Sequence, residues 1–256
     1  MNLELPPELL DEIISHVPLD GEESLRNCSL VAKSWIHPSR RRLFESVDIW
    51  GNKRSKLWFD TISPTNSGVL QHVRSLFCQI TDASHSPGVP TSSFDLIRDY
   101  SLSFRQLRRL TLFSGYLPSF TQIGTTPTFQ RTLSHLCLWC CHVTVSALVT
   151  FVNYFPSLAR LDLVELSHKA GGQPAPPFSR PLEKLSITEF GTDGSLGLLD
   201  QLMELRPECD QVTVGVFWSL CPSLAQRVVD GVEASIKCLS LESDLAGSYC
   251  VPKIPY

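Results

Sequence analysis

The sequence predicts an α/β protein in which a short helical module precedes an array of repeated strand–helix units. Two observations carry this prediction. Residues 1–46 hold short apolar stripes at helical spacing, interrupted by prolines. Residues 47–256 hold a six-residue pattern, Leu-x-x-Leu-x-Leu, that returns at nearly constant intervals. We therefore expect two domains, a helical module over residues 1–46 and a repeat domain over residues 47–256.

The helical module begins with an amphipathic segment. Residues 7–17 carry their apolar side chains at intervals of three and four, which is typical of one face of a helix. The dipeptide Pro6-Pro7 suits the first turn, where the missing N–H of proline has no partner to lose. Further short helices are expected over residues 24–28 and 30–35, and Pro38 is expected to open a last helical turn. So small a module buries little surface alone and is expected to depend on a neighbour or a partner.

The repeat is a strand signal followed by a helix signal. Strong copies of the six-residue pattern begin at Leu107, Leu133, Leu158 and Leu182, and weaker copies begin at Phe44, Val73, Cys209 and Ile236. From residue 107 on, these starting positions differ by 26, 25, 24, 27 and 27 residues, which matches the ~20–29 residues of a leucine-rich repeat. Helical patterns lie between the copies, over residues 94–104, 146–155, 196–205 and 220–236. Because one unit cannot bury its own apolar face, we expect a leucine-rich-repeat-like solenoid with a curved parallel sheet and outer helices.

The copy that begins at Phe44 lies in the same frame as the others. The helical module is therefore expected to run directly into the first strand without a flexible linker. Stretches rich in Gly, Pro and Ser, over residues 84–93 and 170–181, are expected to be loops. Another kind of open parallel α/β sheet is the alternative fold, but no Gly-rich phosphate loop follows any strand, so a nucleotide-binding version has no support.

Three ordered stretches of the helical module carry a resemblance to a known family. They are Leu5-Pro6, Cys28-Ser29-Leu30-Val31-Ala32-Lys33-Ser34-Trp35 and Arg42-Leu43-Phe44. In this order they resemble the F-box of fungal F-box proteins, and the irregular repeats resemble the degenerate leucine-rich arrays of the same proteins. The resemblance implies that the module binds a Skp-type adaptor and, through it, the cullin scaffold of an SCF-type ubiquitin ligase. The adaptor contacts that it implies are Leu5, Pro6, Leu9, Leu10, Ile13, Leu25, Cys28, Val31, Trp35 and Leu43.

The repeat frame also predicts which side chains face away from the core. Alternate residues of a strand point to opposite faces, so the third and seventh positions of each copy lie opposite the leucines. The third position is basic in four successive copies, and the seventh is aromatic in two of them. Our hypothesis is that this face binds an acidic or phosphorylated segment of an unknown protein substrate. The residues concerned are Arg109, Phe113, His135, Trp139, Arg160 and Lys184. The alternative is a solvated face whose charge Asp162, Glu165 and Glu189 partly balance, and it is favoured because isolated surface charge usually contributes little.

Residues 137–142 form the one cluster with metal-ligand spacing. Cys137 and Cys140 are separated by two residues, and His142 is close. A structural zinc site needs four ligands, however, and the sequence has no second Cys-x-x-Cys pair. The repeat explains Cys141 better, since it falls at the Asn/Cys position of the repeat, where the side chain caps backbone groups. We therefore expect no metal and no cofactor, and the lack of a nucleophile motif or phosphate loop favours a protein that is not an enzyme.

Bulk composition limits the remaining function classes. The net charge of -4 favours neither nucleic acid nor an anionic membrane, and Arg40, Arg41 and Arg42 are better explained by a helix end, where cations are favourable. No signal peptide and no apolar run of membrane-spanning length is recognisable. Nine cysteines fit a reducing compartment, so we expect a cytoplasmic or nuclear location, or both. The leading function is the substrate-recognition subunit of an SCF-type ligase, and the alternative is a leucine-rich-repeat scaffold that acts outside the ligase.

Overall fold

The chain forms two compact units in the computed structural model. The first comprises residues 1–113 and 122–134, and the second comprises residues 114–121 and 135–256. The residues that the structure describes are 5–18, 22–50, 67–79, 104–117, 128–168, 174–189, 198, 201, 202, 204, 205, 207–216 and 238–242.

Three helices open the first unit. They are α1 (Pro7–Ser15), α2 (Glu22–Val31) and α3 (Lys33–Leu43), and they bury Leu10, Ile14 and Leu25. The first agrees with the prediction. The second continues to Val31, whereas the sequence placed Leu30 and Val31 in a third helix.

The prediction that Pro38 opens a new helical turn is wrong. It lies inside α3, which is continuous from Lys33 to Leu43. Proline removes one backbone hydrogen bond from a helix interior and normally breaks or kinks the helix. Here Pro38 is buried, so its packing offsets the lost bond.

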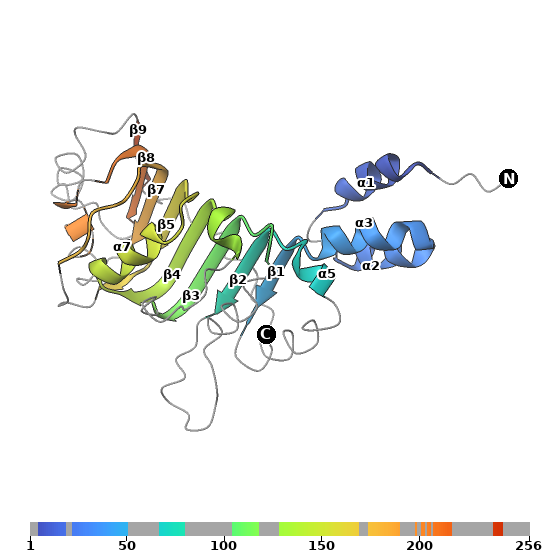
Figure 1. Ribbon diagram of the computed structural model, residues 1–256, viewed down its shortest axis with the longest axis horizontal. Coiled ribbons are helices and arrows are strands. Elements are labelled where there is room, and N and C mark those ends of the chain that lie inside the picture. The colour runs from blue at the N-terminus through green and yellow to red at the C-terminus, as the bar shows by residue number, and fades with distance from the viewer. Residues whose placement is uncertain are drawn as a thin grey trace, which may run out of the picture. The chain divides into compact units, whose positions relative to one another are not determined.

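Three parallel strands complete the sheet of the first unit. They are β1 (Ser46–Ile49), β2 (Ser75–Gln79) and β3 (Arg109–Tyr116), the last of which continues into the second unit (Figure 1). Only residues 44 and 45 separate α3 from β1, which confirms that the module runs directly into the first strand. Two short elements, α5 (Ser67–Leu70) and the 3₁₀ helix η4 (Thr128–Arg131), have no counterpart in the prediction.

The second unit is built from parallel strands in chain order. They are β4 (His135–Val143), β5 (Arg160–Val164), β7 (Leu182–Glu189), β8 (Cys209–Val216) and β9 (Cys238–Glu242). Helix α7 (Val145–Asn153) follows β4 and begins at Thr144, whose hydroxyl accepts a hydrogen bond from the backbone N–H of Ala147 at 3.2 Å. The unpredicted strand β6 (Ser167–His168) pairs with the end of β4.

The strand pairing follows the register of the repeat. In the second unit His135 lies opposite Arg160, and Arg160 lies opposite Lys184, so the third positions of successive copies are neighbours. In the first unit Ser75 lies opposite Arg109 in the same way. The leucines of the strong copies are buried, with at most 3% of their surface exposed. The predicted strands and their inward leucines are therefore confirmed.

Two of the helices predicted between the strands are borne out in the part of the chain that the structure describes. The expected helix over 146–155 is α7, and residues 198, 201, 202 and 204 are helical within the expected segment 196–205. The segments 94–103 and 220–236 and the loop 84–93 lie outside the described residues. Residues 174–181 have neither helix nor strand, as expected of a loop. Each unit is thus an α/β arrangement of parallel strands and helices, compatible with a solenoid-like fold.

Candidate functional site

Helix α1 presents an apolar stripe to the outside of the first unit. Leu9 and Ile13 are spaced four residues apart and expose 50% and 43% of their surface, and Leu5 continues the stripe before the helix. The buried stripe of the same helix, Leu10 and Ile14, points to the core. One amphipathic helix therefore has two apolar faces, of which one is already covered and one is not.

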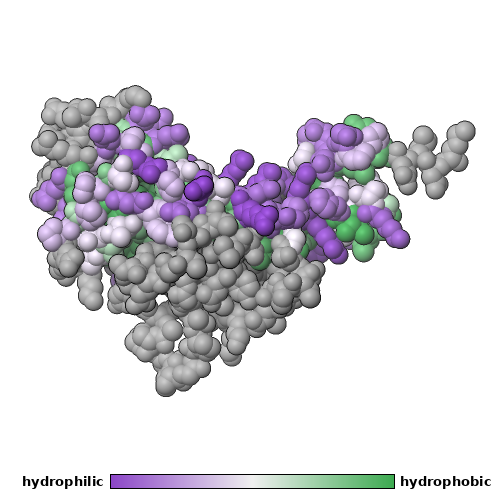
Figure 2. Space-filling model, viewed as in Figure 1, coloured by the Kyte–Doolittle hydropathy of each residue, from purple (hydrophilic) through white to green (hydrophobic). Residues whose placement is uncertain are grey.

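Helix α2 also exposes apolar side chains. Leu30 exposes 82% and Val31 exposes 67% of its surface at the end of α2, whereas Leu25 exposes only 1%. Green patches over the N-terminal helices mark exposed hydrophobic surface in Figure 2. Among the other residues predicted to contact an adaptor, Pro6 is exposed, and Cys28, Trp35 and Leu43 are half-buried. The structure thus separates the ten predicted contacts into an exposed group, a half-buried group and two core residues, Leu10 and Leu25.

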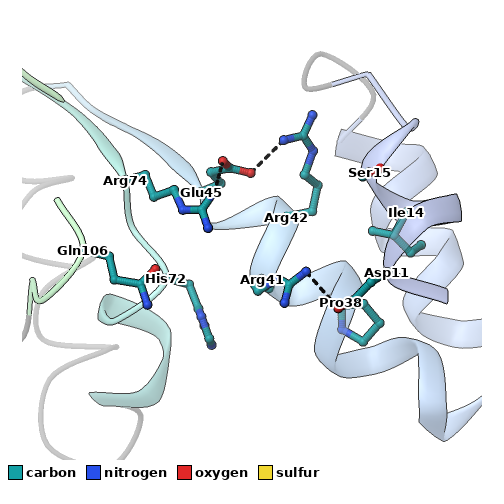
Figure 3. Close-up of a pocket in the computed structure, with 10 residues that line it drawn as sticks. All are labelled: Asp11, Ile14, Ser15, Pro38, Arg41, Arg42, Glu45, His72, Arg74 and Gln106. Atoms are coloured by element: carbon teal, nitrogen blue, oxygen red, sulfur yellow. Dashed lines mark hydrogen bonds and ion pairs between the residues drawn. The ribbon is translucent and has the colours of Figure 1, made fainter. Parts of the chain in front are cut away.

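Ion pairs join the helices to the start of the strands. The carboxylate of Glu45 accepts hydrogen bonds from Arg42 at 2.7 Å and from Arg74 at 3.0 Å, and Arg41 lies 3.1 Å from Asp11 (Figure 3). Burial raises the pKa of Glu45, but the hydrogen bond from Arg42 and the charge of Arg74 outweigh it, so this pKa lies below its ordinary value. Glu45 is therefore an ionised bridge between α3 and β2.

A pocket of about 150 Å³ lies beside this bridge in the first unit. Figure 3 shows Arg41, Arg42 and Arg74 around it, together with His72 and Gln106. Burial lowers the pKa of His72, and the neighbouring positive charges of His37, Arg41 and Arg74 lower it further. The Nε atom of Arg42 is buried without a hydrogen-bond partner. The pocket is a polar junction between the helices and the start of the strands of the first unit.

The outward face of β1 to β3 carries an aromatic cluster. Trp50 and Phe77 lie with ring centroids 4.4 Å apart, and Phe113 lies 5.9 Å from Phe77 and 5.8 Å from Trp50. All three rings remain partly exposed. The sequence singled out Phe113 but missed its two partners, which the register of parallel strands brings beside it. Arg109 lies on the same strand as Phe113 and is exposed.

The outward face of β4 and β5 carries a carboxylate between two basic side chains. Asp162 accepts a hydrogen bond from His135 at 2.6 Å and from Nε of Arg160 at 2.9 Å. Its side chain is 11% exposed, and burial raises its pKa, but the two hydrogen bonds and the adjacent charges outweigh burial and lower it. The predicted basic row is therefore neutralised at this point, although Arg160 remains 45% exposed and Lys184, next in register, is partly exposed.

A second carboxylate, Glu165, holds the aromatic position of β4. It accepts hydrogen bonds from the indole N–H of Trp139 at 2.8 Å and from the thiol of Cys140 at 2.9 Å. Cys140 and Glu165 have φ values of 53° and 51°, and Ser114 has 51°. These three residues occupy the eighth position of successive repeat copies, so a left-handed residue lies inside β3 and β4 and directly after β5. Sequence periodicity does not reveal this turn, because none of the three is glycine.

The cysteines of β4 have structural surroundings. Cys141 is buried, and its thiol donates a hydrogen bond to the carbonyl oxygen of Trp139 at 3.4 Å, as expected of a side chain that caps the backbone. Burial raises the pKa of Cys141 to about 12, and burial with the adjacent Glu165 raises that of Cys140 to about 12. Within the described part of the chain, no group of three or more His, Cys, Asp or Glu residues is placed to hold a metal ion.

Comparison with known proteins gives no family assignment. No family model matches the chain, and no curated protein matches its sequence. Among the residues that the structure describes, no helix has the length and apolar character that a bilayer crossing requires.

Proposed function

We propose that the chain is the substrate-recognition subunit of an SCF-type cullin–RING ubiquitin ligase. In this proposal α1 to α3 form an F-box that binds a Skp-type adaptor, and the strands form degenerate leucine-rich repeats that bind a protein substrate. The subunit performs no chemistry; it raises the effective concentration of the substrate beside a ubiquitin-charged enzyme. Such a receptor would act in the cytoplasm, the nucleus or both.

The exposed apolar stripe of α1 is the observation that carries the proposal. Leu5, Leu9 and Ile13 expose between 43% and 50% of their surface, and Leu30 and Val31 on α2 expose still more. Soluble proteins rarely gather so many exposed aliphatic side chains on one small module unless a partner covers them. A helix that lays apolar anchors into a partner's groove fits this geometry.

We propose different tasks for the ten contacts that the resemblance implies, according to how far each is buried. We place Leu5, Pro6, Leu9, Ile13 and Val31 in the adaptor interface. We add Leu30, which the resemblance does not imply, because its side chain is exposed. Cys28, Trp35 and Leu43 form its half-buried margin. Leu10 and Leu25 are buried and stabilise the helical module instead.

The outward face of the strands is the proposed substrate surface. In the first unit it offers the rings of Trp50, Phe77 and Phe113 and, separately, the exposed Arg109 at the start of β3. In the second unit the accessible cations are Arg160 and Lys184, because His135 and Trp139 are held by Asp162 and Glu165. This combination suits a segment that contains both apolar and acidic residues.

The test compares two double variants of the same helix in capture of purified adaptor and cullin. Leu9→Gln/Ile13→Gln alters the apolar stripe, and Glu8→Gln/Glu12→Gln alters the polar stripe as a control. Leu9 and Ile13 each have about half their surface still to bury, which corresponds to about 1 kcal/mol each. We therefore expect at least about 30-fold weaker adaptor binding in the first variant and little change in the second.

Two results would contradict the proposal. One is a parent protein that captures no adaptor, and the other is equal binding by both double variants. Capture of the adaptor without cullin would instead indicate the alternative, a repeat scaffold that acts outside the ligase.

A further inference from the structure

The edge of the first unit's sheet where its strands begin is lined with arginines. Its exposed members are Arg74, Arg105, Arg108, Arg109 and Arg131. We call this set the arginine edge. The proposed adaptor surface contains none of these arginines, and the proposed substrate surface contains only Arg109.

Backbone hydrogen bonds stack the loops that carry these arginines. The N–H of Arg108 donates to the carbonyl oxygen of Arg74 at 2.8 Å, and the N–H of Ser134 donates to that of Arg108 at 3.0 Å. The hydroxyl of Thr132 donates to the carbonyl oxygen of Leu107 at 2.8 Å. Neighbouring loops are therefore separated by about 4.8 Å, the spacing of paired strands.

The repeat frame arranges the side chains in short rows. Arg74 and Arg108 both follow the first residue of a repeat copy, and Arg105 and Arg131 both precede it by two. Stacking therefore places each pair at equivalent positions of successive loops. Folding therefore brings these positive charges together in rows, although the sequence contains no long continuous run of basic residues at these positions.

The arginine edge has little compensating negative charge. Glu45 lies at its start, but this carboxylate already binds Arg42 and Arg74. Within the described part of the chain, no carboxylate forms an ion pair with Arg105, Arg108, Arg109 or Arg131. Figure 2 shows strongly hydrophilic surface over this end of β1 to β3. Like charges at equivalent positions of neighbouring loops repel one another, and a bound anion removes that repulsion.

The chemistry of the edge selects the partner. Every cation in it is arginine, whose planar guanidinium binds carboxylates through two parallel hydrogen bonds. The side chains between them in the described loops are polar or buried, such as Gln106 and Ser134, so nucleic-acid bases find no aromatic stacking platform here. We propose that the arginine edge binds an acidic segment of a partner protein, rich in Asp and Glu. This proposal goes beyond the ligase function and holds whether or not the helices bind an adaptor.

The experiment uses the full chain and a fluorescein-labelled peptide of alternating Glu and Ser, followed by fluorescence anisotropy at low salt. Arg105→Gln/Arg108→Gln/Arg131→Gln removes three charges from the edge. Arg26→Gln/Lys33→Gln/Arg40→Gln removes three charges from exposed positions of the same unit and is the matched control. We expect about tenfold weaker binding in the edge variant and less than about twofold in the control. Thermal melting of both variants establishes that they fold.

Several outcomes would overturn the proposal. Equal losses in the two triple variants would show attraction to net charge alone. Equal binding of a Gln–Ser peptide would show that carboxylates are not recognised. Tighter binding of a single-stranded oligothymidylate through the same arginines would identify a nucleic acid as the partner. None of these results bears on adaptor capture, so failure here is distinct from failure of the ligase proposal.

Discussion

Replacement of Asp162 by Asn tests whether the carboxylate on the outward face of β5 stabilises the second unit. The aspartate is 11% exposed and joins His135 on β4 to Arg160 on its own strand. Hydrogen bonds to charged groups contribute about 1.5–3 kcal/mol each. Asn keeps one acceptor oxygen and the same shape, and the half-exposed Arg160 regains water, so Asp162→Asn should cost about 2 kcal/mol. At the size of this chain, that corresponds to a melting temperature lower by about 4–8 °C.

The same variant has a defined pH dependence. The folded pKa of Asp162 lies below its unfolded value, so its stabilisation is complete above the unfolded pKa and is lost as the pH falls through the folded one. The melting temperatures of parent and variant should therefore differ near neutral pH and converge as the pH falls below about 4. Differential scanning calorimetry measures both, with the exposed Glu183→Gln on β7 as a control that changes stability by less than about 0.5 kcal/mol. An Asp162→Asn protein as stable as the parent near neutral pH would refute this account, as would a difference that persists in acid.

Two further predictions concern burial in the helical module and in β4. Leu25→Ala should destabilise the protein by about 2–5 kcal/mol, because the side chain of Leu25 is only 1% exposed. Leu30→Ala should cost less than about 0.5 kcal/mol, because Leu30 is 82% exposed. Thermal denaturation measures both changes, and equal losses of stability would mean that α2 is oriented differently. Cys140 should react with iodoacetamide near pH 8 about a thousandfold more slowly than an ordinary thiol, since its pKa of about 12 leaves almost no thiolate. Peptide mass spectrometry before and after addition of urea measures this rate, and rapid labelling of the folded protein would show that Glu165 does not hold the thiol in its protonated form.

Some of the candidate surfaces could be predicted from the sequence and some could not. The stripe of Leu9 and Ile13 is visible as periodicity, but Leu10 and Ile14 have the same periodicity on the next face. Which of the two stripes is covered depends on where α3 and the strands lie, and this is a tertiary property. The arginine edge cannot be recognised in the sequence for a related reason. Its members are far apart along the chain and come together only in the folded protein, where the loops stack.

The sequence alone determined the strands of the repeat copies, their order and their register, whereas the two-residue strand β6 has no counterpart in the pattern. In each copy of the six-residue pattern the fourth and sixth residues are apolar and two positions apart, so both lie on one face of the strand, which packs against the core. Shifting any strand by one residue would therefore expose its leucines. That argument predicts Arg160 between His135 and Lys184, and the strand pairing agrees.

Only the tertiary structure decided what these side chains do. Asp162 binds both His135 and Arg160, and Glu165 holds Trp139, because packing across strands sets which charges come within hydrogen-bond distance. Tertiary packing also keeps Pro38 inside α3, where its burial outweighs the tendency of proline to end a helix. The apolar periodicity can be read from the sequence. The hydrogen-bond partner of each side chain, and the free energy lost when that partner is removed, depend on the folded structure.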